Sequence, residues 1–177
     1  MARAIFLDRD GVINRKAPEG SYIATLAELE ILPGSIEAIA KLSGLGWRIF
    51  LISNQRGIAR GMVAAADVER IHQAISQQVR SAGGEIAQVY VCPHDYSDKC
   101  DCRKPSPGMI LQAAREHSLD LAQSWIVGDS LSDMQAGHSA GCRTAYLGEG
   151  EYETADITAP SLAAFVEELQ KQLSGFI

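Results

Sequence analysis

Short apolar runs alternate with amphipathic segments along the chain. The runs are largely uninterrupted by polar residues, which is typical of strands that are buried on both faces. The predicted strands are residues 4–7, 47–52, 89–91, 125–127 and 144–147. Apolar residues at helical spacing predict helices between these strands. One helix opens at 33–35, one covers 64–82, one opens at 107–108, one covers 134–140, and a closing helix covers 161–173.

The regular alternation of strand and helix determines the predicted fold class. It predicts an α/β protein with a Rossmann-like, doubly wound parallel sheet of about five strands. The 177 residues fit one domain, and no repeat, low-complexity tract or linker interrupts them. Residues 1–177 are therefore predicted to form a single domain. Predicted elements and short loops fill the segments 11–52 and 54–103, so a separate cap domain is not expected.

Composition and charge exclude several classes of protein. Apolar residues make up 46% of the chain and charged residues 21%, as in ordinary soluble globular proteins. No apolar run reaches the roughly 18 residues that suggest a membrane span, so no membrane partner is expected. The run at 4–7 is too short for a signal peptide, and the expected location is therefore the cytoplasm. The net charge of −6 and the lack of a basic block argue against nucleic acid as a partner.

Polar side chains follow three of the predicted strands. Asp8 and Asp10 come after the first strand, Ser53 ends the second, and Asp129 follows the fourth. The carboxyl ends of parallel strands meet at one edge of the sheet, where ligands bind. Two carboxylates there can act as an ionised nucleophile and a protonated acid, and oxygen ligands suit Mg²⁺. Lys104 adds a compact positive charge suited to phosphate.

Each of these residues also has a structural interpretation. The Asp-rich segment after the first strand is a common turn composition, and Ser53 is able simply to end a strand. Lys104 fits a solvated surface charge, and Asp129 fits a cap of the helix that follows it. The joint order of the residues and their positions at strand ends favour a phosphate-handling site over four separate structural roles.

Three cysteines and one histidine lie close together after the third predicted strand. Cys92, His94, Cys100 and Cys102 form the pattern C-x-H-x5-C-x-C. Three thiolates and one imidazole make a closed tetrahedral set that is typical of structural Zn²⁺. The alternative is a loop of reduced cysteines with a surface histidine. A zinc ion here would cross-link the loop that precedes Lys104 without taking part in the chemistry.

The remaining cysteine and histidines have no predicted chemical role. Cys142 precedes the fifth predicted strand and is expected to be a buried apolar residue. His72, His117 and His138 lie on predicted helices, where surface or core positions are expected rather than catalytic ones.

Four segments, in order, resemble the motifs of the haloacid dehalogenase-like phosphohydrolases, and this resemblance covers most of the chain. The segments are residues 6–12, residues 51–55, the lysine of residues 102–105, and residues 127–134. An aspartate at position 10 resembles the phosphatases of this family rather than its dehalogenases or ion-pumping ATPases. Asp133 matches an acid of the fourth motif whose role the sequence leaves open.

The resemblance implies a mechanism for the matched residues. Asp8 would attack phosphorus and form an aspartyl-phosphate, and Asp10 would protonate the leaving alkoxide and later deprotonate the attacking water. Mg²⁺ would be held by Asp8, the backbone carbonyl of Asp10, Asp129 and waters. Ser53 and Lys104 would hold the phosphoryl oxygens.

The zinc loop resembles two groups within this family, the heptose bisphosphate phosphatases and the histidinol-phosphatase domains. Residues 53–61 and 102–109 resemble the first group, whereas the five-residue spacer between the two pairs of zinc ligands resembles the second. The expected partner is therefore a small phosphosugar, with histidinol phosphate as the alternative substrate and a zinc-dependent binding module as the alternative class. The chain is expected to act as a monomer. The expected substrate-binding residues are Arg9, Asn54, Gln55, Arg56 and Arg103.

Overall fold

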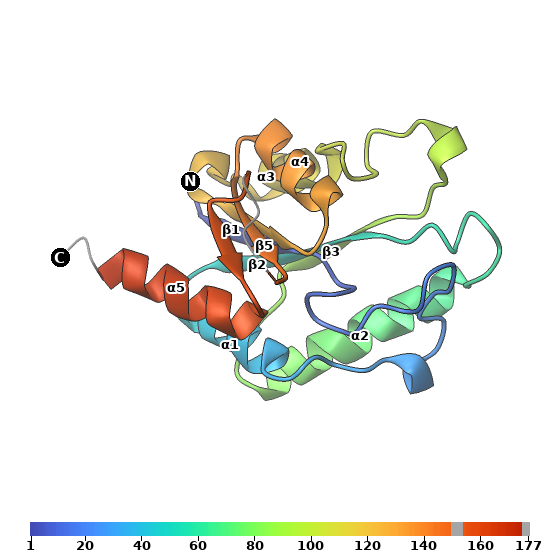
Figure 1. The fold of residues 1–177 in the computed structure, drawn as a ribbon, viewed down its shortest axis with the longest axis horizontal. Coiled ribbons are helices and arrows are strands. Elements are labelled where there is room, and N and C mark those ends of the chain that lie inside the picture. The colour runs from blue at the N-terminus through green and yellow to red at the C-terminus, as the bar shows by residue number, and fades with distance from the viewer. Residues whose placement is uncertain (150–153, 175–177) are drawn as a thin grey trace.

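A computed structural model describes residues 1–149 and 154–174 of the protein. In these residues a six-stranded parallel sheet has the order β3-β2-β1-β4-β5-β6 (Figure 1). The strands are β1 (Ala4–Leu7), β2 (Arg48–Asn54), β3 (Gln88–Cys92), β4 (Trp125–Gly128), β5 (Arg143–Leu147) and β6 (Ile157–Ala159). The structure therefore confirms the predicted doubly wound α/β class.

Helices cover both faces of this sheet (Figure 1). They are α1 (Ser35–Gly44), α2 (Ala65–Ser81), α3 (Gly108–His117), α4 (Leu131–Ala140) and α5 (Leu162–Ser174). One core cluster joins α1, α2 and α5 to one face, and a second joins α3 and α4 to the other. Strand β1 serves both clusters, because Ile5 and Leu7 enter the first and Ala4 and Phe6 the second.

The sixth strand is the element that the apolar pattern misses. Strand β6 has three residues and pairs with β5 through Ala145 and Ile157. So short a run cannot be recognised by periodicity, because it contains only two buried residues. No helix among the described residues has the length and apolar surface that crossing a bilayer requires.

Helix α4 begins three residues before the predicted start. Ser130 caps it, and the Asp133 carboxylate accepts from the Ser130 backbone N–H at 3.2 Å, which forms a capping box. The prediction placed the start at Met134, the first apolar residue of the helix that is buried, and so missed the polar first turn.

Parallel pairing brings the predicted site residues to one edge. Asp8 follows β1 directly, Ser53 lies at the end of β2, and Asp129 follows β4. Strands β1, β2 and β4 are neighbours in the sheet, so these three positions meet although they are far apart in sequence.

Candidate active site

Lys104 is a buried cation between two carboxylates. Its Nζ lies 2.8 Å from Asp8 Oδ1 and 2.6 Å from Asp133 Oδ1, and it donates to the Ile52 carbonyl at 3.0 Å. The lysine side chain is 3% exposed, and the ammonium uses three donors on three partners. The structural alternative of a solvated surface lysine is therefore wrong.

Burial and charge act in opposite directions on this pair. Burial raises the pKa of Asp8 to about 7, with the Lys104 charge opposing the rise and the Asp133 charge adding to it. Burial acts to lower the pKa of Lys104, but the Asp133 and Asp8 carboxylates outweigh it and raise that pKa. Lys104 is therefore charged at neutral pH.

Asp133 is the buried partner that the sequence left open. Its second oxygen, Oδ2, accepts from the Ser130 hydroxyl at 2.5 Å, so both oxygens are engaged. Gly128 provides the space, because a Cβ at that position would lie 2.3 Å from Asp133 Cγ. Asp133 thus anchors Lys104 from the side opposite Asp8.

Asp129 completes a group of carboxylates that suits a hard cation. Ligand oxygens of Asp8, Asp129 and Asp133 lie within 4.8 Å of one another. Asp129 Oδ2 pairs with Lys16 Nζ at 2.6 Å, while its Oδ1 is buried without a hydrogen-bond partner among the described residues. An orphaned buried carboxylate oxygen is unfavourable unless a cation coordinates it, so the donor set fits Mg²⁺.

Gly11 makes this approach of Asp129 possible. Its φ is +89°, and a Cβ there would lie 1.8 Å from Asp129 Oδ2. A side chain at position 11 would therefore both strain the backbone and displace the carboxylate.

Three donors hold Asp10. Its Oδ1 accepts from Arg9 at 3.0 Å and from Asn14 at 2.9 Å, and its Oδ2 accepts from Gln55 Nε2 at 3.1 Å. Gln55 Nε2 also donates to the Ser53 hydroxyl at 2.7 Å, which links the ends of β1 and β2. Arg9 and Gln55, which are predicted to bind substrate, are 1% and 3% exposed, contact Asp10 and line the same small cavity as Asp10.

Asn54 pairs with the backbone of Lys104 at the edge of the small cavity that Asp10 also lines. Its amide donates to the Lys104 carbonyl at 3.0 Å, and its Oδ1 accepts from the Lys104 N–H at 3.1 Å. This reciprocal pair attaches the loop before α3 to the end of β2. The loop is what brings the lysine ammonium to Asp8.

Arg56 and Arg103 flank one exposed aromatic ring. Their guanidinium carbons lie 4.4 and 4.3 Å from the ring centroid of Tyr96, which is 66% exposed. Arg56 also pairs with Asp95 at 2.5 Å, and Arg103 donates to the His94 carbonyl at 3.3 Å. The guanidinium groups of Arg56 and Arg103 therefore lie together beside the loop that carries the predicted zinc ligands.

The four predicted zinc ligands form a compact group. The Cys92 and Cys100 sulfurs are 3.6 Å apart, the Cys100 and Cys102 sulfurs 3.4 Å, and His94 Nδ1 lies 3.7 Å from Cys92 and 3.2 Å from Cys102. Zn–S and Zn–N bonds of about 2.3 and 2.0–2.1 Å in a tetrahedron separate ligand atoms by about 3.5–3.8 Å, and the observed separations lie within a few tenths of an ångström of that range. The spacing and chemistry of the donors fit a zinc ion. The fourth cysteine, Cys142, is buried as predicted.

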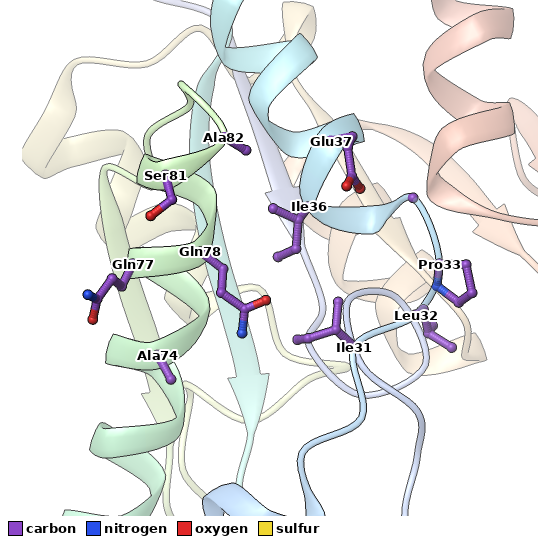
Figure 2. Close-up of a pocket in the computed structure, with 11 residues that line it drawn as sticks. Ile31, Leu32, Pro33, Ile36, Glu37, Ala74, Gln77, Gln78, Ser81 and Ala82 are labelled. Carbon is purple, nitrogen blue, oxygen red and sulfur yellow. The ribbon is translucent and has the colours of Figure 1, made fainter.

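Two cavities differ in their relation to this site. One of about 760 Å³ lies between α1 and α2, is lined by Ile36, Gln78 and neighbouring residues (Figure 2), and has no predicted site residue in its lining. A smaller cavity of about 220 Å³ is lined by Asp10, Asn54, Gln55 and the 16–23 loop. Chemistry rather than size identifies the second as the candidate site.

Comparisons with known proteins agree with this fold and chemistry. A family model of HAD-hydrolase-like proteins matches residues 101–171. A D-glycero-beta-D-manno-heptose-1,7-bisphosphate 7-phosphatase of Pseudomonas aeruginosa is 43% identical over 152 residues, covering 85% of this chain and 84% of the relative. A D-glycero-alpha-D-manno-heptose-1,7-bisphosphate 7-phosphatase of Mycobacterium bovis is 42% identical over 136 residues, covering 76% and 71%.

A solved structure supports the same placement. The D,D-heptose 1,7-bisphosphate phosphatase from B. bronchiseptica, crystallised with magnesium and phosphate, has a TM-score of 0.88 at 36% identity, covering 96% of this chain and 99% of that one. The fold and the site therefore define a phosphatase of the haloacid dehalogenase-like class. Within that class, the chain belongs to the family of the D-glycero-D-manno-heptose-1,7-bisphosphate 7-phosphatases.

Proposed function

We propose that this protein hydrolyses the C7 phosphate of D-glycero-D-manno-heptose 1,7-bisphosphate, a step toward activated heptose for surface glycans. The observation that carries the chemistry is the Asp8 carboxylate at the tip of β1, 2.8 Å from the buried Lys104 ammonium. The relatives' names support the sugar. The two arginines beside Tyr96 support a second anionic group on the substrate.

In this mechanism the carboxylate of Asp8 attacks phosphorus and the ester P–O bond breaks. Asp10 gives its proton to the departing C7 alkoxide, so the sugar leaves as an alcohol. Asp10 then takes a proton from the water that hydrolyses the aspartyl-phosphate, which releases phosphate and restores Asp8. The Lys104 ammonium, which contacts Asp8 in this structure, and the Ser53 hydroxyl hold the phosphoryl oxygens during both steps.

The magnesium ion is proposed from the donor set. Asp8, Asp129 and the Asp10 carbonyl would hold it, and the orphaned Asp129 Oδ1 gives it a ligand. When bound, Mg²⁺ neutralises negative charge that builds on the transferring phosphoryl group. The magnesium in the B. bronchiseptica relative supports this choice of metal.

Arg103 and Arg56 favour a bisphosphate over histidinol phosphate. Guanidinium groups match phosphate geometry and remain charged at every physiological pH. Histidinol phosphate carries an ammonium group in place of a second phosphate, and like charges disfavour binding there. Between β1 and α1 the described chain has one 3-10 turn (Leu26–Glu28), and between β2 and α2 it has no helix or strand, so loops are left to select the substrate.

Phosphate release from a substrate panel tests this function. With Mg²⁺ present, we expect kcat/KM for heptose 1,7-bisphosphate to exceed that for histidinol phosphate by at least about 10-fold, because loss of one charge-assisted phosphate contact costs roughly 1.5–3 kcal/mol. The panel includes both anomers of the bisphosphate. Equal or faster turnover of histidinol phosphate would overturn the proposal.

We also propose that Cys92, His94, Cys100 and Cys102 hold a structural zinc ion. Four protein ligands leave no open position for water, so the ion would stabilise the loop that carries Arg103 and Lys104.

The change Cys102→Ser tests this zinc site. We expect bound zinc to fall from about one per chain to near zero and Tm to drop by several degrees, because metal-binding free energy contributes to folding. Elemental analysis and thermal unfolding measure the two quantities, with Cys142→Ala as the cysteine control. A C102S protein that keeps stoichiometric zinc contradicts the assignment.

A further inference from the structure

A buried histidine lies behind the general acid. His72 is on the inner face of α2 and is 2% exposed, beside apolar neighbours such as Ile71 and Ile75. Its Nε2 lies 3.5 Å from the NH1 group of Arg9. The NH2 group of the same guanidinium donates to Asp10 Oδ1 at 3.0 Å. One buried arginine, 1% exposed, therefore connects the helix to the acid.

The contact fixes the protonation of the imidazole. A guanidinium has donors and no acceptor, so the Nε2 of His72 must accept, and the ring proton lies on Nδ1. Burial, with the Arg9 charge adding to it, lowers the pKa of His72 to about 4, so the ring is neutral at physiological pH. His72 is thus a neutral acceptor for a charged donor.

This arrangement has a cost in folding. His72 Nδ1 is buried with no hydrogen-bond partner among the described residues, and an unsatisfied buried polar group costs about 1–3 kcal/mol. An apolar side chain, like those of Val68 and Ile75 on the same face, would avoid that cost. Unlike an apolar side chain, the histidine supplies a hydrogen-bond acceptor for Arg9.

The donors around Asp10 give Arg9 a specific task. A carboxylate accepts hydrogen bonds at about four lone-pair sites, two on each oxygen. Arg9 and Asn14 take both sites on Oδ1, and Gln55 takes one on Oδ2. The single remaining site is on Oδ2, so the proton that is transferred must be carried there.

We propose that His72 is a positioning residue for catalysis, which holds the Arg9 guanidinium so that the acidic proton of Asp10 is confined to Oδ2. The inference rests on the proposed role of Asp10 as general acid. Without an acceptor at position 72 the guanidinium is free to turn, one site on Oδ1 opens, and part of the Asp10 population carries its proton on the wrong oxygen.

The dependence of kcat/KM on the leaving group distinguishes a role in proton transfer from a purely structural role. An alkoxide needs protonation as the P–O bond breaks, whereas p-nitrophenolate leaves without it. The ratio kcat/KM reports steps up to phosphoryl transfer to Asp8 and excludes the later hydrolysis step, in which Asp10 also acts. Partial unfolding lowers kcat/KM for both esters equally.

The experiment compares His72→Leu with His72→Gln on heptose bisphosphate and p-nitrophenyl phosphate, with Mg²⁺ present. We expect H72L to lower kcat/KM for the sugar ester about 10- to 100-fold and for the aryl ester less than about 3-fold, because small misplacements of a general acid cost that much. The amide oxygen of H72Q accepts from Arg9, so this variant should recover most of the sugar-ester rate. Ile75→Val is the control for a small change in the same helix face.

The variant Asp10→Asn distinguishes the role of His72 from the role of Asp10 as general acid. If D10N shows the same selective loss and H72L lowers both esters equally, the role of His72 is wrong and that of Asp10 stands. If D10N also lowers both esters equally, the general-acid assignment itself fails. A selective loss in both variants, with recovery in H72Q, supports the proposal.

Discussion

Replacing Asp8 with asparagine should lower phosphatase turnover by at least about 10⁴-fold, because an amide cannot form the aspartyl-phosphate. The side chain keeps its size, and its oxygen still accepts from Lys104 Nζ, which now lies 2.8 Å from Asp8 Oδ1. Phosphate release from heptose bisphosphate measures the loss.

The control for D8N is its fold. Burial disfavours the charge of Asp8, so the neutral amide should unfold at a temperature close to that of the parent protein. A variant that stays folded and retains more than about a hundredth of the activity would refute the nucleophile, since loss of a covalent nucleophile costs far more.

Replacing Lys104 with methionine should have the second largest effect, on both stability and rate. The change leaves the Asp8 and Asp133 carboxylates buried without their cation, and breaking a buried ion pair costs about 3–5 kcal/mol. The rate should fall at least about 10²-fold, because a preorganised donor to the phosphoryl group is lost. Urea unfolding without metal and phosphate release with Mg²⁺ measure the two effects.

A double variant separates the two consequences. In Lys104→Met with Asp133→Asn, the buried charge opposite Asp8 is also removed, so much of the lost stability should return while the activity does not. Activity that returns with stability would show that Lys104 acts only by holding the fold. Loss of activity without loss of stability in K104M would show that Asp133 does not depend on this lysine.

Most of the fold follows from short apolar runs, and the departures have local causes. A three-residue strand such as β6 offers too few positions for periodicity. The start of α4 was missed because its first turn is polar, capped by Ser130 and Asp133. Both features are held by backbone pairing or capping rather than by a run of apolar side chains.

The sequence predicts the site residues whose position is set by the end of a strand. It predicts less well the residues whose role depends on the orientation of the side chain. Strand ends place Asp8, Ser53 and Asp129 together without reference to rotamers. Sequence alone does not show that Arg9 turns inward to Asp10. The sequence left His72 open as a surface or core residue, and its place among the buried residues of α2 and its contact with Arg9 became visible only in the structure.

The role of Asp133 also depends on a side-chain contact that the sequence does not show. Its spacing from Asp129 matched a motif, yet its task became visible only when Lys104 was seen between it and Asp8. Lys16, which pairs with Asp129 at 2.6 Å, has no sequence motif that would mark it as a partner of that carboxylate. Contacts between charged side chains from separate loops require the fold before they can be read.

The central claim is that Asp8 bonds to phosphorus, and a crystal structure with Mg²⁺ and trifluoroberyllate tests it most directly. The account predicts beryllium bonded to an Asp8 carboxylate oxygen, with Lys104 Nζ and the Ser53 hydroxyl on its fluorines. Beryllium bonded to another carboxylate, or trifluoroberyllate held without a bond to Asp8, would contradict it.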